Sequence, residues 1–137
     1  MEAEELLRRY DAGERDFPKT NLFGVNLSGA NLSGINLSEA NLSGVDFEEI
    51  NLWQANLSGA HFEGSCIYDG IFIESNLSGA GFFESNLRGS IFYKANLNNT
   101  IMSDSTFHGA NFTRATIHNA KIRNIYFTHI LHQYKQT

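Results

Sequence analysis

The chain has 137 residues with a formal net charge of −5, and 42% of its residues are hydrophobic and 18% charged. That length suits one domain. The acidic balance argues against direct nucleic-acid binding, and a longest apolar run of three residues excludes a transmembrane helix. The first twenty residues contain no secretory signal, and Cys66 has no second cysteine to pair with. We therefore expect one cytoplasmic domain without a membrane segment.

Residues 2 to 12 predict a short helix. Acidic side chains occupy its first turn, arginines follow four residues later, and Gly13 stands just past its end. Leu6, Leu7 and Tyr10 form its apolar stripe. We expect residues 1–13 to act as a helical cap that packs this stripe on the structure that follows.

A five-residue repeat follows the predicted helix. From Phe17 to Phe127, every fifth residue is large and apolar, at twenty-three positions in all and without an insertion. We call this position the centre. The residue two before it is usually small, and the residue directly before it is usually Asn. A period of five fits neither a helix nor a flat strand. It indicates a backbone that turns by the same angle in every repeat, with the centres and the small residues facing inward.

The Ala-Asn-Leu-Ser-Gly units, such as residues 55–59, resemble the pentapeptide-repeat proteins, and the resemblance covers residues 15–129. It implies an all-β solenoid, the right-handed quadrilateral β-helix with four repeats per coil. About 23 repeats would then make nearly six coils over residues 14–129. A C-terminal tail or cap would follow at 130–137. Residues 4–17 also resemble the leader of many cyanobacterial members.

Four repeats per coil make residues twenty apart stacked neighbours. In one interior column, large centres have small partners: Gly70 accompanies Phe72, and Ser90 accompanies Phe92. The Asn residues predict a ladder of side-chain amides between coils. Gly stands two residues after the centre in only nine of twenty-three repeats, so we expect that the corner turns do not all require a positive φ.

The repeat pattern ends after Phe127. We expect Ile130, Leu131 and Tyr134 either to fold over the last coil or to form a dimer contact, because an open solenoid end is a template for aggregation.

No nucleophile, metal-binding or phosphate-binding motif is present, so we expect neither an enzyme nor a cofactor. Cys66 and the histidines are interpreted as solvated surface residues; the histidines are His61, His108, His118, His129 and His132. A small acidic surface is predicted at Asp46, Glu48, Glu49 and Asp69. It is interpreted as a solvated face, with a weak divalent-cation site as the alternative.

Charge is segregated along the chain. Residues 20–87 contain eight acidic residues and no Lys or Arg, whereas residues 88–137 contain six basic residues and one acidic residue. The acidic stretch favours one reading that the family resemblance implies, a DNA mimic that binds a DNA-processing enzyme such as DNA gyrase. The basic C-terminal part opposes that reading.

One face of the predicted shaft carries apolar residues where the repeat elsewhere places Ser or Asn. We call this set the apolar patch; it consists of Trp53, Ile71, Ile73, Ile91 and Tyr93. Trp and Tyr are favoured anchors of protein interfaces. The leading hypothesis is therefore a non-catalytic, rigid scaffold that binds an unidentified protein, with a homodimer through the patch or the C-terminal end left open.

Overall fold

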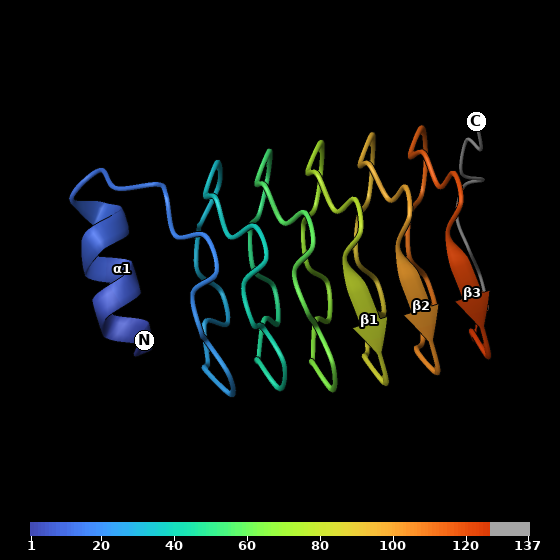
Figure 1. The fold of residues 1–137 in the computed structure, drawn as a ribbon, viewed down its shortest axis with the longest axis horizontal. Coiled ribbons are helices and arrows are strands. Elements are labelled where there is room, and N and C mark those ends of the chain that lie inside the picture. Colours follow the sequence, from blue (N-terminus) through green and yellow to red (C-terminus); the bar gives the residue numbers. More distant parts are fainter. Residues whose placement is uncertain (127–137) are drawn as a thin grey trace.

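The computed structural model describes residues 1–126 as a helix set against one end of a straight stack of coils (Figure 1). The elements are α1 (Ala3–Asp11), β1 (Gly81–Phe83), β2 (Ile101–Ser103) and β3 (Lys121–Arg123). The predictions for Phe127, His129, Ile130, Leu131, His132 and Tyr134, and for the tail 130–137, lie outside the described residues.

Neighbouring coils pair in parallel at a spacing of twenty residues. Strands β1, β2 and β3 form a parallel sheet in which Gly81 pairs with Ile101 and Ile101 with Lys121. Elsewhere single bridges link the coils at the same spacing, from Asp16 with Asn36 onward. Each residue therefore stacks on the residue twenty positions later.

The interior contains the centres and the small residues two before them. Every centre from Phe17 to Ile117 is at most 4% exposed, whereas Ile122, the last centre among the described residues, is 46% exposed and departs from the prediction. The rings of Phe72 and Phe92 stack with their centroids 5.0 Å apart, and Phe92 stacks on Phe112 at 5.1 Å. The small partner is required beside them, because a Cβ at Gly70 would come within 2.9 Å of Cε2 of Phe72. The predicted match of large centres with small partners is thus present in this column.

The corner turns differ from the prediction. All twenty-two residues two positions after a centre, from Lys19 to Asn124, have φ between +52° and +73°, and thirteen of them are not glycine. Two backbone hydrogen bonds hold the corner, as the turn from Leu22 to Val25 shows. The Leu22 carbonyl accepts from Val25 N–H at 3.1 Å, and the corner N–H of Gly24 donates to Ser43 O in the next coil. The turn is of the type that requires positive φ at this position. The expectation failed because these bonds hold even Glu and Lys in the left-handed region.

Adjacent residues Glu48 and Glu49 test this backbone strain. Glu49 has φ +57°, whereas Glu48 is not among the positive-φ residues, and both are exposed. We expect Glu49→Gly to raise the free energy of unfolding by up to about 1 kcal/mol, and Glu48→Gly to lower it by about 0.5–1 kcal/mol. Both variants remove one carboxylate from the same surface. Urea denaturation measures the difference, and an equal loss in both variants would contradict the strain argument.

The Asn residues mostly do not form the predicted ladder. Within residues 1–126, each Asn directly before a centre accepts a hydrogen bond at Oδ1 from the backbone N–H two residues on, as Asn56 does from Ser58 at 3.1 Å. Amide contacts between coils at this position occur from Asn36 to Asp16 and from Asn41 to Asn21. Asn is favoured here because its short side chain caps its own turn.

Helix α1 packs its apolar stripe on the first coil. Leu6 is fully buried and Tyr10 is 9% exposed, while Leu7 is only partly buried. The Tyr10 hydroxyl donates to Ser33 O at 2.6 Å. The helix ends in a turn in which Gly13 (φ +102°) donates to Tyr10 O and Glu14 donates to Arg9 O.

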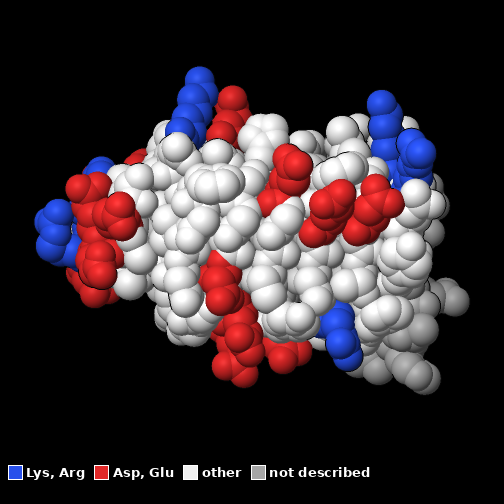
Figure 2. Space-filling model, turned by 90° about the horizontal axis from the view of Figure 1, so that it is seen from below, with Lys and Arg blue, Asp and Glu red and all other residues white. Residues whose placement is uncertain are grey.

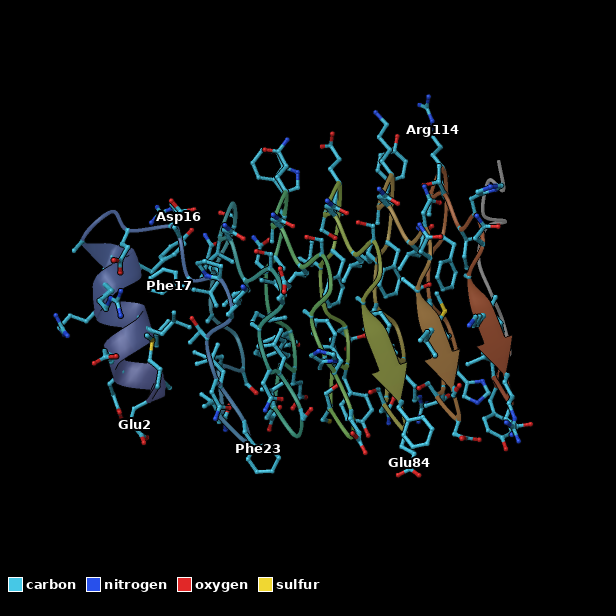
Figure 3. All side chains as sticks on the ribbon, viewed as in Figure 1. Glu2, Asp16, Phe17, Phe23, Glu84 and Arg114 are labelled. Carbon is cyan, nitrogen blue, oxygen red and sulfur yellow. The ribbon has the colours of Figure 1, made fainter. Side chains whose placement is uncertain are left out.

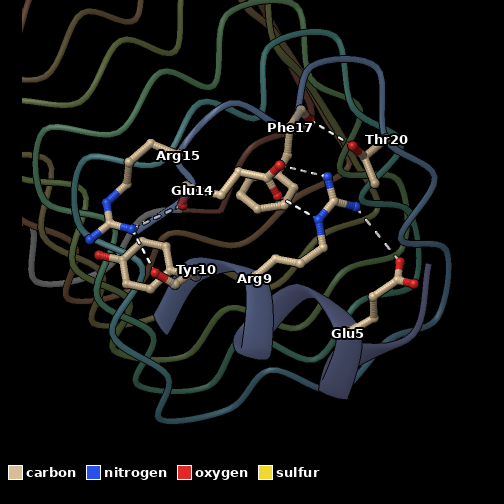
Figure 4. A network of polar contacts seen from close by, with 7 residues as sticks. All are labelled: Glu5, Arg9, Tyr10, Glu14, Arg15, Phe17 and Thr20. Carbon is tan, nitrogen blue, oxygen red and sulfur yellow. Dashed lines mark hydrogen bonds and ion pairs between the residues drawn. The ribbon is translucent and has the colours of Figure 1, made fainter. Parts of the chain in front are cut away.

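A polar network fixes the linker between α1 and the first coil (Figure 4). The Arg9 guanidinium donates two hydrogen bonds to the Glu14 carboxylate and lies 5.0 Å above the Phe17 ring. The Arg15 guanidinium lies 3.7 Å from the centre of the Tyr10 ring. The hydrogen bond from Arg9 lowers the pKa of Glu14. These contacts hold the helix at a defined place on the end of the stack.

Candidate interaction surface

The apolar patch occupies one wall over three successive coils. Ile71 pairs directly with Ile91, and Asn51 and Asn111 continue the same row on either side. The N–H of Gln54 donates to Ile73 O, and that of Glu74 donates to Tyr93 O, so Trp53, Ile73 and Tyr93 belong to stacked turns. Trp53 is 43% exposed, and the other four side chains are half-buried. The patch therefore exposes less apolar surface than its composition suggests, because neighbouring apolar groups shield one another.

A row of corner residues borders this wall. We call it the rim row; it consists of Gln54, Glu74, Lys94 and Arg114, all of them exposed. Figure 3 shows Arg114 at one edge of the shaft and Glu84 at the opposite edge. The Lys94 ammonium lies 5.4 Å from the centre of the Tyr93 ring. Along the shaft the rim row thus changes from neutral to acidic to basic.

The predicted acidic surface adjoins the other border of the same wall. Asp46 Oδ1 accepts hydrogen bonds from the Ser28 hydroxyl at 2.7 Å and from Glu48 N–H at 3.2 Å. Glu49 and Asp69 are corner residues. Residues 1–126 contain no group of three or more His, Cys, Asp or Glu side chains that could hold a metal ion.

Cys66 is a free, half-buried thiol beside the acidic surface. Burial raises the pKa of this thiol, and the nearby carboxylates of Asp46 and Glu48 raise it further. A raised pKa lowers the fraction of thiolate, which is the reactive form.

We expect Cys66 in the folded protein to react with a thiol reagent at pH 7 more slowly than Cys66 in the chain unfolded by guanidinium. The rate in the folded protein should rise toward that of the unfolded chain only as the pH passes the raised pKa. Absorbance kinetics at several pH values measure both rates. A folded protein that reacts as fast as the unfolded chain at pH 7 would contradict this reading of the site.

Further exposed apolar residues, which the sequence did not predict, lie on another wall. Phe83 is 42% exposed and Ile101 48% exposed, and they flank centres of the column that contains Phe82 and Met102. Phe23, in the first turn of the same column, is 68% exposed and lines a cavity of about 520 Å³ beside the start of α1. Comparing the columns of all four walls, rather than one, would have identified these residues.

A comparison of the sequence with models of protein families agrees with this fold, in which residues twenty apart stack and the centres are buried. The model of the pentapeptide repeats matches eight copies, in segments that together span residues 20–128. The chain belongs to the pentapeptide-repeat family. Members of this family form right-handed quadrilateral β-helices, and they are generally structural or interaction proteins.

Solved structures of pentapeptide-repeat proteins resemble the chain. The protein alr5209 from Nostoc PCC 7120 is 21% identical over 93% of this chain and 96% of its own, with a TM-score of 0.50. A member from the cyanobacterium Cyanothece 51142 is 23% identical over 91% of this chain and 95% of its own, with a TM-score of 0.44. QnrB1, a plasmid-mediated fluoroquinolone resistance protein, is 15% identical over 83% of this chain and 70% of its own, with a TM-score of 0.47. These likenesses concern the fold alone.

A comparison with curated proteins finds none that matches the chain. Among the described residues, no helix has both the length and the apolar character needed to cross a membrane.

Proposed function

We propose that this pentapeptide-repeat protein is a non-catalytic, rigid scaffold in the cytoplasm that binds another protein through the apolar patch. The observation that carries the proposal is the stacking of Trp53, Ile73 and Tyr93 on one wall, with Ile71 and Ile91 paired beside them. The wall that follows it in the chain carries Asn and Ser at the same positions, from Asn36 to Asn96. Three aromatic or branched side chains in one column offer a partner anchors that Ser and Asn do not.

Rigidity follows from the way the coils are joined. Each coil hydrogen-bonds to its neighbours through backbone groups at every turn, and the interior is filled by stacked rings and aliphatic side chains. We propose about 23 repeats in nearly six coils for the whole shaft. A surface built on such a frame keeps its shape when it binds, so little free energy is lost in ordering it.

The test is a double variant that removes the two aromatic anchors. Trp53→Ser with Tyr93→Ser places a residue common in the repeat at two outward positions, so we expect the fold to survive. Interface anchors contribute about 2 kcal/mol or more each, so binding should fall at least about tenfold. Capture from host-cell extract measures the loss of specific partners. Gel filtration of the pure proteins measures the loss of self-association.

Phe83→Ser is the matched control, because Phe83 and Trp53 are almost equally exposed, at 42% and 43%, on different walls. The proposal requires that the double variant, and not this control, loses its partners. If the folded double variant captures the same proteins and has the same oligomeric state as the parent chain, the patch is tolerated surface.

The second candidate is mimicry of DNA toward a DNA-processing enzyme such as DNA gyrase. The observation in its favour is the stretch from 20 to 87 without Lys or Arg, and Figure 2 shows acidic side chains over the middle of one face while most basic ones lie toward the ends. A gyrase supercoiling assay with titrated protein separates the two. Inhibition that disappears when Asp46, Glu48, Glu49 and Asp69 are changed to Asn or Gln would favour mimicry over the scaffold.

A further inference from the structure

The rim row reverses its charge in the middle of the apolar patch. Glu74 directly follows Ile73, and Lys94 directly follows Tyr93, one coil further along. Gln54 lies one coil before this pair, and Arg114 one coil after it. Within residues 1–126 the ion pairs involve only Arg9, so none of these rim charges forms a salt bridge with another described residue. The row is therefore an exposed, unneutralised dipole beside an apolar surface.

We propose that the partner seated on the apolar patch is a second copy of the chain, docked face to face with the two shafts antiparallel. The proposal rests on the proposed function of the patch and names its occupant. A two-fold axis lies in the interface, perpendicular to the shafts, and passes between the coils of Ile73 and Tyr93. Such a rotation reverses the direction of the shaft and keeps each edge of the wall on its own side.

This symmetry pairs opposite charges along the rim row. Glu74 of each copy faces Lys94 of the other, and Gln54 faces Arg114. In the apolar patch Ile73 meets Tyr93 and Ile71 meets Ile91. The Arg114 guanidinium of one copy comes beside Trp53 of the other, where a cation–π contact adds to the attraction. One self-complementary surface thus buries the apolar residues and pairs the charged ones.

The opposite border of the wall is compatible with the same arrangement. Its corner residues are Glu49, Asp69, Gly89 and Gly109, and the rotation sets Asp69 against Gly89 and Glu49 against Gly109 of the second copy. No like charges meet there. A parallel pair of shafts would instead set Glu74 against Asp69 of the second copy, so charge repulsion disfavours that alternative.

The interface is small, and this sets its strength. The apolar patch spans three coils spaced about 4.8 Å apart and is three residues of about 3.3 Å each in width. The area of such a patch is well below the roughly 800 Å² that each partner buries in a standard interface. We therefore expect a weak dimer that forms only at high protein concentration. Because the rim charges are exposed, the dimer should weaken as salt rises.

The test is a set of charge swaps followed by sedimentation equilibrium from about 1 to about 500 µM protein, a range wide enough to detect a weak dimer. Glu74→Lys and Lys94→Glu each put like charges together twice per dimer, and each should weaken the dimer at least about tenfold. The double variant with both changes should dimerise as the parent chain does. An equimolar mixture of the two single variants should form a heterodimer, since both contacts are then attractive.

Glu84→Lys is the matched control. Glu84 is an exposed corner residue with φ +53°, close to the +57° of Glu74, and it lies at the opposite edge of the shaft (Figure 3). This control should leave the dimer unchanged. Circular dichroism of every variant checks that the fold is intact.

Three results would overturn the proposal: a parent chain that stays monomeric at the highest concentration, single swaps without effect, or a double swap that does not restore the dimer. If the parent chain is monomeric but Trp53→Ser with Tyr93→Ser still loses a captured protein, the patch binds a different partner, and only the second-copy proposal fails. If the parent chain dimerises and Trp53→Ser with Tyr93→Ser has no effect, both proposals fail.

Discussion

Phe72→Ala is expected to lower the free energy of unfolding by about 3–5 kcal/mol, the range for removing a fully buried ring. Phe72 is completely buried and stacks on Phe92 at 5.0 Å. The coils above and below are fixed by backbone hydrogen bonds, so the surrounding structure cannot collapse into the space. Urea denaturation followed by circular dichroism measures the loss.

Ser78→Ala is the control for this prediction. Ser78 points outward from the wall that carries Asn and Ser, and its N–H donates to Asn76 Oδ1, a contact that alanine retains. We expect a change below about 0.5 kcal/mol. Similar losses at positions 72 and 78 would mean that Phe72 does not lie in a closed interior.

Deletion of residues 1–13 is expected to make the protein associate and to lower its stability by about 3 kcal/mol or more. The deletion removes buried Leu6 and Tyr10, each worth about 1.5–3 kcal/mol, and the hydrogen bond from Tyr10 to Ser33 O. It also uncovers the first coil, whose unpaired edge then serves as a template for other chains. Light scattering at increasing concentration detects the association.

Arg8→Ala serves as the comparison for the deletion, because Arg8 is an exposed side chain of α1. This variant should remain as monodisperse and stable as the parent chain at the same concentration. A truncated chain that is equally soluble and stable would show that α1 does not protect the end of the solenoid.

The sequence by itself determined the repeat, the inward positions and the place of the helix. A large apolar residue at every fifth position leaves the chain no other way to bury all of them than around one axis, which is why the sequence assigned the centres to the interior. The assignment is confirmed from Phe17 to Ile117 and is wrong at Ile122, which is 46% exposed. The charge order and Gly13 similarly predicted the helix near residues 2–12, one residue beyond each end of α1. The apolar patch was located because equal spacing places equal positions on one wall.

The tertiary structure alone decided the backbone of the corners, the role of Asn and the exposure of the walls. Glu49 adopts a positive φ because hydrogen bonds to its own turn and the next coil outweigh its local preference. The amide of Asn56 bonds its own turn because that donor is nearer than the next coil. Ile73 is half-buried because of neighbours twenty residues away. The alignment of Glu74 and Lys94 in one rim row depends on the same stacking. Spacing along the chain assigns a residue to a wall, but only the packed neighbours set what it contacts and how much of it stays exposed.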